Sequence, residues 1–184
     1  GLGGPYVPSA QILRTTNSGL TWTVVVNTID SDAAWTCGAD MQGTIIVPFT
    51  GGGVDDGKIY RSDDYGVTFS ALANPVFFGT DAVNGLTYLG DSEWLVGTDN
   101  GGTGAAVCGI YSSSDNGDTW TEVQDLTGVD SDTRTYAIAV DENLNIVAGT
   151  FNIGGTGKIW RGTYTYSAGS SAGLTIYSGS TQII

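Results

Sequence analysis

One eight-residue phrase occurs three times in this chain of 184 residues. It has the pattern Ser/Thr-x-Asp/Asn-x-Gly-x-Thr-Trp/Phe, and its copies begin at Thr15, Ser62 and Ser113, which lie 47 and 51 residues apart. A similar apolar pair stands before each copy: Ile12-Leu13, Ile59-Tyr60 and Ile110-Tyr111. A fourth pair, Ile159-Trp160, follows 49 residues after the third, without the phrase. A period near fifty residues with strand-like content predicts the blades of a β-propeller.

The fixed positions of the phrase are those that a tight β-hairpin needs. The Asp or Asn can accept hydrogen bonds from backbone N–H groups of the turn, and the Gly supplies a positive φ. The Thr then begins the next strand, and we expect the aromatic residue to be largely buried between sheets. The predicted hairpin residues are Thr15, Asn17, Gly19, Thr21 and Trp22 in box 1; Ser62, Asp64, Gly66, Thr68 and Phe69 in box 2; and Ser113, Asp115, Gly117, Thr119 and Trp120 in box 3. A catalytic role for the third position is disfavoured, because one of the three residues there is an amide.

With three copies in register, the sequence resembles the Asp-box, or bacterial neuraminidase repeat, family of β-propellers. Glycine-rich segments between the boxes repeat as well, at 50–53, 98–102 and 152–155, so the resemblance covers nearly the whole chain. It implies an all-β fold of four-stranded antiparallel blades, with each box in the turn between the third and fourth strands. It also implies that ligands bind on the face opposite the boxes.

We expect one domain, 1–184, with about three and a half blades. A half blade at 10–27 precedes three blades at about 33–73, 82–124 and 134–178. Natural propellers have roughly four to eight blades, and open sheet edges have to be covered. We therefore expect completion by a longer polypeptide or a second copy, in preference to a small ring closed by the residues after Tyr177. The first residue is Gly, which favours a processed chain or a piece of a longer one.

Charge narrows the classes of partner. The chain has 19 acidic residues, 6 basic residues and no His, for a net charge of −13. A negatively charged surface repels phosphate backbones, so we do not expect the chain to bind nucleic acid. It is compatible with a salty medium, with divalent cations, or simply with solubility. No apolar run is long enough for a transmembrane helix, so membrane insertion is not expected.

The face implied for ligands would carry two Asp-Ser-Asp triplets and several neighbouring side chains. The candidate loop residues are Asp30, Asp32, Trp35, Asp99, Asp130, Asp132, Arg134 and Tyr136. Carboxylates on flexible loops can bind Ca²⁺, for which Asp30, Asp32, Asp130 and Asp132 are the candidates. Ordinary turn chemistry is the favoured interpretation of the same triplets, and no other cofactor is expected.

An enzyme of this family would need residues that the chain lacks. Sialidases resemble one another in three arginines that clamp the substrate carboxylate, an acid/base Asp, and a Tyr nucleophile paired with a Glu. Here Arg14, Arg61 and Arg161 stand beside the boxes or the box-like position, and only Arg134 falls in a ligand-face loop. The absence of His excludes Ser-His-Asp and Cys-His catalysis. We therefore expect no enzymatic activity.

The two cysteines, Cys37 and Cys108, lie in apolar contexts in different repeats. We expect two buried thiols, and a disulfide is the alternative if the chain is extracellular.

The sequence predicts a non-catalytic, acidic β-propeller that serves as a structural or interaction module of an extracellular or virion-surface assembly, such as a fibre, a tail or an adhesin. Its expected partners are itself or the remainder of a larger polypeptide. The alternative is a propeller that recognises a glycan or a protein through its loops. A sialidase-like glycoside hydrolase fragment is the third hypothesis.

Overall fold

The fold is described from a computed structural model of the chain. The structure describes residues 10–27, 34, 36–49, 58–72, 83–98, 108–125, 134–151, 157–165 and 173–177. Every regular element in these ranges is a β-strand, as predicted. No helix long and apolar enough to cross a membrane occurs among them.

The strands form four antiparallel sheets, and neighbours in each sheet follow one another in the sequence. The first sheet has two strands, β1 (Gln11–Arg14) and β2 (Thr23–Asn27). The second comprises β3 (Gly38–Ala39), β4 (Ile45–Pro48), β5 (Ile59–Ser62) and β6 (Ser70–Ala71). The third comprises β7 (Val83–Gly90), β8 (Glu93–Thr98), β9 (Gly109–Ser113) and β10 (Thr121–Asp125). The fourth comprises β11 (Arg134–Val140), β12 (Asn145–Phe151), β13 (Lys158–Thr165) and β14 (Gly173–Tyr177).

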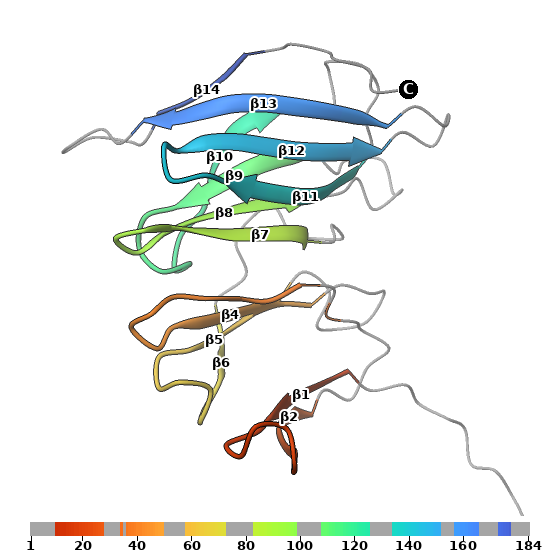
Figure 1. The fold of residues 1–184 in the computed structure, drawn as a ribbon, viewed down its shortest axis with the longest axis vertical. Coiled ribbons are helices and arrows are strands. Elements are labelled where there is room, and N and C mark those ends of the chain that lie inside the picture. The colour runs from red at the N-terminus through yellow and green to blue at the C-terminus, as the bar shows by residue number, and fades with distance from the viewer. Residues whose placement is uncertain are drawn as a thin grey trace, which may run out of the picture.

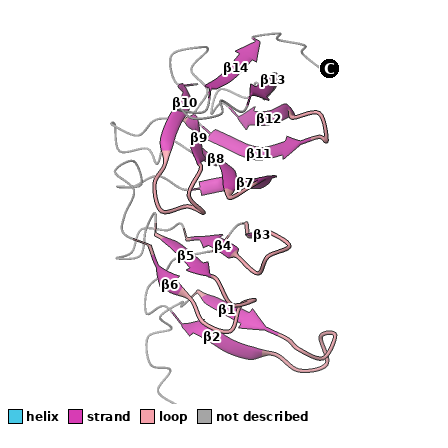
Figure 2. Cartoon of the chain, turned by 90° about the vertical axis from the view of Figure 1, so that its left-hand side faces the viewer, coloured by secondary structure: helices cyan, strands magenta, loops and turns pink. Residues whose placement is uncertain are grey.

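The sheets follow one another in a row, from β1 and β2 at one end to β13 and β14 at the other (Figures 1 and 2). The first strand of each four-stranded sheet contacts the first strand of the next, β3 with β7 and β7 with β11. The strands of the four sheets lie within 11–27, 38–71, 83–125 and 134–177. Boxes 2 and 3 lie between the third and fourth strands of their sheets, and box 1 lies between β1 and β2.

Strand register makes positions in different sheets equivalent. Ile59 lies opposite Pro48 on β4, Ile110 opposite Gly97 on β8, and Ile159 opposite Gly149 on β12. Two residues before Pro48, Gly97 and Gly149 on these strands lie Ile46, Leu95 and Val147, which are equivalent in the same way. Each sheet therefore presents the same two apolar positions on the same side.

The core lies between the sheets. One buried cluster joins the second and third sheets: Ile46, Ile59, Val83, Trp94, Val96 and Tyr111. The other joins the third and fourth: Leu95, Cys108, Ile110, Ile138, Ile146, Ala148, Trp160 and Tyr164. Alternation along the third sheet places Trp94 and Val96 toward the second sheet and Leu95 and Ile110 toward the fourth. The third and fourth sheets approach each other closely at Gly97, where an added Cβ would lie only 2.6 Å from Thr135 Cγ2.

Two expectations about side chains need correction. Trp120 and Phe69 are half-buried, but Trp22 is 58% exposed, so the prediction of three largely buried rings is wrong for box 1. Trp120 packs against the cluster between the second and third sheets, whereas no described sheet precedes the first one to cover Trp22. Both cysteines are free, and Cys108 is buried, but Cys37 is exposed, so two buried thiols is also wrong.

Candidate functional site

The three boxes share one hydrogen-bonding scheme, centred on the Asp or Asn. In box 2, Asp64 Oδ1 accepts from the backbone N–H groups of Thr68 (2.8 Å) and Val67 (3.0 Å), and the Thr68 hydroxyl donates to Oδ2 (2.7 Å). In box 3, Asp115 accepts from the backbone N–H (2.8 Å) and the hydroxyl (2.6 Å) of Thr119. Each carboxylate thus ties the turn to the strand that follows it.

Box 1 reaches the same geometry with an amide. Asn17 Oδ1 accepts from the Thr21 N–H (2.9 Å), and Asn17 Nδ2 donates to the Thr21 hydroxyl oxygen (2.8 Å). The hydroxyl reverses its role, since a threonine oxygen can donate or accept. The third position is therefore occupied by a turn-forming group, whether or not that group carries a charge.

The first position of each box completes the turn. Thr15, Ser62 and Ser113 each accept from the N–H of the box glycine, at 3.0, 2.8 and 2.8 Å. Gly19, Gly66 and Gly117 have φ values of 86°, 77° and 89°, which confirms the positive φ predicted for box glycines. The residue before each glycine, Ser18, Tyr65 or Asn116, also has a positive φ, which the sequence did not reveal.

The same hydrogen bonds lower the pKa of the box carboxyls. The Thr68 N–H and hydroxyl, followed by the Ser62 hydroxyl, lower the pKa of Asp64 to about 2. For Asp115, partial burial raises the pKa, but the hydrogen bonds from Thr119 and Ser113 outweigh it, and the net shift is downward. A general acid must hold a proton near the working pH, so neither carboxyl is suited to that role.

A second set of aspartates shapes the turns between the first and second strands of two sheets. Asp40 Oδ1 accepts from the N–H groups of Gln42, Gly43 and Thr44, at 2.9, 2.7 and 2.7 Å. Asp141 accepts from the Asn145 side chain and backbone, both at 2.8 Å, and these bonds lower its pKa. Sequence reasoning missed these residues, although an Asp at the end of a predicted strand is a usable signal for such a turn.

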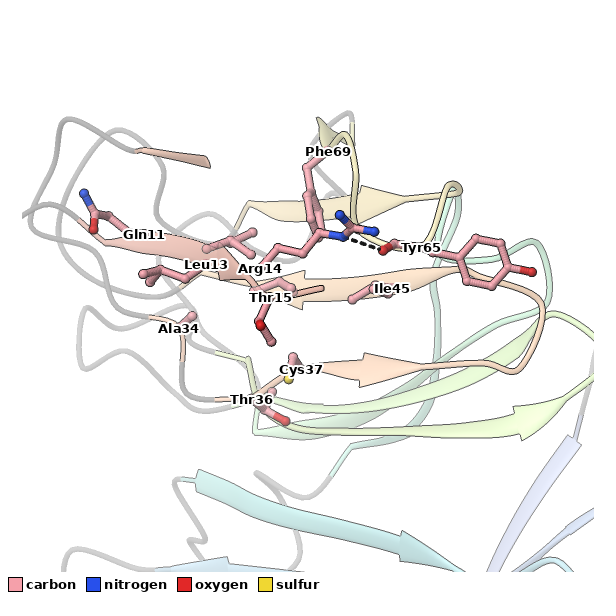
Figure 3. Close-up of a pocket in the computed structure, with 13 residues that line it drawn as sticks. Gln11, Leu13, Arg14, Thr15, Ala34, Thr36, Cys37, Ile45, Tyr65 and Phe69 are labelled. Carbon is pink, nitrogen blue, oxygen red and sulfur yellow. Dashed lines mark hydrogen bonds between the residues drawn. The ribbon is translucent and has the colours of Figure 1, made fainter. Parts of the chain in front are cut away.

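The boxes also lie against the preceding sheet, and two arginines bridge the gap. Arg14 Nε of the first sheet donates to the backbone carbonyl of Tyr65 in box 2, at 3.1 Å (Figure 3). Arg61 Nη1 of the second sheet donates to the carbonyl of Asn116 in box 3, at 3.1 Å, and to Asp118 Oδ1, at 2.7 Å. Tyr65 and Asn116 are the residues before the box glycines, so the two contacts repeat. We name this contact the arginine clasp.

Beside the first clasp lies a pocket of about 640 Å³ between β1 and the second sheet. Its apolar lining comes from both sides, with Ile12 on β1 and Ile45, Val47 and Phe69 from the second sheet. Strand β1 pairs with β2 alone among the described strands, whereas β5, β9 and β13 each pair on both edges. Among the described strands, β1 therefore keeps one unpaired edge, and the pocket beside it has a mainly apolar lining.

Most of the predicted ligand-face residues lie outside the described residues: Asp30, Asp32, Trp35, Asp99, Asp130 and Asp132. The proposed calcium ligands fall wholly in this group. Of the two described residues, Arg134 donates from Nη1 to the Tyr136 hydroxyl at 3.0 Å, so the structure brings this pair together. No cluster of acidic or sulfur ligands suited to a metal occurs within the described ranges.

Comparison with known proteins gives little beyond the fold. No family model matches the chain, and no curated protein matches it. Among solved structures, a β-propeller described as "YCF48 bound to D1 peptide" superposes with a TM-score of 0.47 and 14% identity. The match covers 72% of this chain and 37% of that one. A likeness at this level transfers neither an activity nor a ligand.

Proposed function

We propose that the chain belongs to an Asp-box β-propeller and serves as a non-catalytic structural and interaction module of an extracellular or virion-surface assembly. The observation that carries this proposal is the use of the repeated polar residues. The box carboxylates bind their own turns, and Arg14 and Arg61 bind the turn of the next sheet. The repeated polar side chains are therefore engaged within the fold, the carboxylates in their own turns and the two arginines between sheets.

The proposal that the chain is not an enzyme has electrostatic support. The pKa of Asp64 is about 2, and that of Asp115 is lowered, so both are anions at neutral pH. Two of the three box-side arginines are used in clasps between sheets. A sialidase-like clamp needs convergent arginines on one ligand, an arrangement that these clasps do not provide.

Surface location rests on composition. Only 6 of the 184 residues are Lys or Arg, and the glycine-rich segments between strands are short of basic residues, which suits an exterior protein exposed to proteases. The proposed partners are further copies of the chain or the rest of a longer polypeptide. Calcium at the Asp-Ser-Asp triplets is a lesser proposal.

Recognition of a ligand is the second candidate function, and the pocket beside β1 favours it. An extended apolar segment that paired with the open edge of β1 would place alternate side chains among Ile12, Val47 and Phe69. A bound protein segment suits this pocket better than a glycan, because its walls are mainly apolar.

The location and the activity can be tested separately. An antibody raised against the chain is expected to label the outer surface of intact cells or particles, and labelling confined to broken cells would contradict the assembly role. The purified chain is expected to release no fluorophore from a panel of fluorogenic sialosides and other glycosides, and to retain no glycan selectively on an array. Asp64→Asn is the matched control, since Asn17 forms the same turn in box 1. Turnover that Asp64→Asn abolishes without loss of fold would show that the carboxylate is catalytic.

A further inference from the structure

The outward side of the fourth sheet repeats a surface that is covered elsewhere in the row. Ile46 and Leu95 are 0% exposed, whereas the equivalent Val147 is 42% exposed. Ile59 and Ile110 are also 0% exposed, whereas the equivalent Ile159 is 42% exposed. In the second and third sheets these positions are covered by the sheet that follows. We name the uncovered copy, formed by Val147, Gly149, Ile159 and Arg161, the tail face.

The surroundings of Gly149, at the centre of the tail face, also show that this face is uncovered. Gly97 and Gly149 are equivalent by strand register. A Cβ on Gly97 would lie 2.6 Å from Thr135 of the following sheet, whereas a Cβ on Gly149 would meet nothing within 4 Å. At Gly97 the lack of a side chain allows the following sheet to approach closely. The fourth sheet has a glycine at the equivalent position, Gly149, but the space next to it is open.

Arg161 adds to the tail face a guanidinium group at the position of the two arginines that form clasps. It follows the apolar pair Ile159-Trp160, as Arg14 follows Ile12-Leu13 and Arg61 follows Ile59-Tyr60. Both equivalents clasp the carbonyl before the box glycine of the next sheet. Arg161 is exposed, and no hydrogen bond or ion pair of its side chain is seen in the described part of the chain. The tail face thus has a donor in the position from which a clasp is made.

The first sheet has, on its outward side, the equivalents of the residues by which the later sheets pack against the sheet before them. Tyr111 and Trp120 of the third sheet pack toward the sheet before it, and their equivalents in the first sheet are Leu13 and Trp22. Leu13 is 47% exposed and Trp22 is 58% exposed. The carbonyl of Ser18 stands before Gly19, equivalent to the clasped carbonyls of Tyr65 and Asn116. We name Leu13, Ser18 and Trp22 the head face.

We propose that the tail face of one copy binds the head face of a second copy, with Arg161 clasping the Ser18 carbonyl across the interface. This inference rests on the proposed interaction role and specifies its site. The contact continues the interfaces already present between consecutive sheets of one chain. Identical tail faces are poorer partners for one another, because a two-fold contact would bury two Arg161 guanidinium groups and offer no box carbonyl to either.

A head-to-tail contact is heterologous, so repeated copies form a ring if the rotation closes and a filament if it does not. Either product leaves no internal tail face exposed. The proposed occupant is a second copy of this chain because the chain itself supplies both complementary surfaces.

Sedimentation of the purified chain over a wide range of concentrations tests the contact. The wild type is expected to associate reversibly, and Arg161→Glu is expected to weaken association by about tenfold or more, because the clasp is lost and an acidic group replaces it. Val147→Asp is expected to weaken it further. Met41→Asp, at a turn position that is 94% exposed and outside both faces, is the matched control and should leave association unchanged. Circular dichroism establishes that each variant is folded.

Cross-linking tests the orientation. In a Cys37→Ser background, chains with Ser18→Cys are mixed with chains carrying Thr163→Cys, which lies on the same side of β13 as Arg161 and leaves the clasp intact, and treated with a short bismaleimide. Mixed dimers are expected, whereas dimers of the Thr163→Cys chain alone would overturn the head-to-tail contact in favour of a two-fold one. A wild-type chain that stays monomeric at all concentrations would also overturn the proposal. Neither result affects surface labelling, so the assembly role is judged independently.

Discussion

Ile110 and Ile159 allow a direct test of the packing between sheets, since they are the same residue at equivalent positions. Ile110 is fully buried between the third and fourth sheets, and Ile159 is 42% exposed on the tail face. Replacement by Ala removes three carbons from each side chain. At about 0.8 kcal/mol per buried carbon the transfer term for Ile110 is roughly 2.4 kcal/mol, and the cavity left behind raises the total to about 3–4 kcal/mol.

The same substitution at Ile159 removes a partly exposed side chain. No enclosed cavity forms on an open face, and only the buried part of the transfer term is lost. Ile159→Ala is therefore expected to cost roughly 1–1.5 kcal/mol. The difference between the two variants, roughly 1.5–3 kcal/mol, is more reliable than either value, because both share the same unfolded-state change.

Equilibrium urea unfolding followed by tryptophan fluorescence measures both losses, at a protein concentration too low for association. For a chain of this size Ile110→Ala should also lower Tm by about 6–16 °C, against a few degrees for Ile159→Ala. Equal losses for the two variants would refute the equivalence of the positions or the stacking of the sheets. A change in the urea dependence itself would show that the mutation altered the unfolded state or the cooperativity.

Three further predictions concern the boxes. Gly117→Val should lower the free energy of unfolding by about 1–3 kcal/mol in urea titrations, because φ is +89° and a Cβ would lie 3.1 Å from Ile46 Cδ1, whereas Gly149→Ala should be nearly neutral. The pKa of Asp64 is lowered to about 2, so its stabilising contribution is present above the unfolded pKa near 3.9 and is lost as the pH falls toward 2; thermal melts of Asp64→Asn should show a weaker loss in this range than the wild type. Trp120→Ala should cost about 3 kcal/mol and Trp22→Ala under about 1 kcal/mol in the same titrations, and a reversed order would contradict the burial of box 3 and the exposure of box 1.

Local turn chemistry was accessible from the sequence, because it depends on residues close together in the chain. The Asp or Asn, the glycine and the Thr of each box lie within five residues, and their contacts follow from spacing and residue type. In box 2 the left-handed residue before the glycine was not accessible. Tyr65 occupies this position in box 2, and a tyrosine gives no signal for a positive φ.

Contacts between sheets were the part that the sequence did not predict. The equivalence of Arg14, Arg61 and Arg161 is visible in the sequence, but their acceptors are backbone carbonyls, which every residue has. The exposure of Trp22 has a similar origin, since its box has the same pattern as the others. Burial of that ring depends on a neighbouring sheet, and no local pattern encodes a neighbour.

Two of the three interfaces within the row indicate how stability and orientation depend on apolar packing and on the clasp. Between the second and third sheets, Arg61 clasps the Asn116 carbonyl over a buried apolar cluster. Between the third and fourth, Ser112 stands at the arginine position, and the sheets are held by apolar packing and the close approach of Thr135 to Gly97. Because the interface between the third and fourth sheets forms without a clasp, we infer that burial of the apolar positions supplies most of the stability of such an interface. The arginine mainly sets the orientation of the two sheets. A tail face that has both Val147 and Arg161 should therefore lose more association through Val147→Asp than through removal of the arginine.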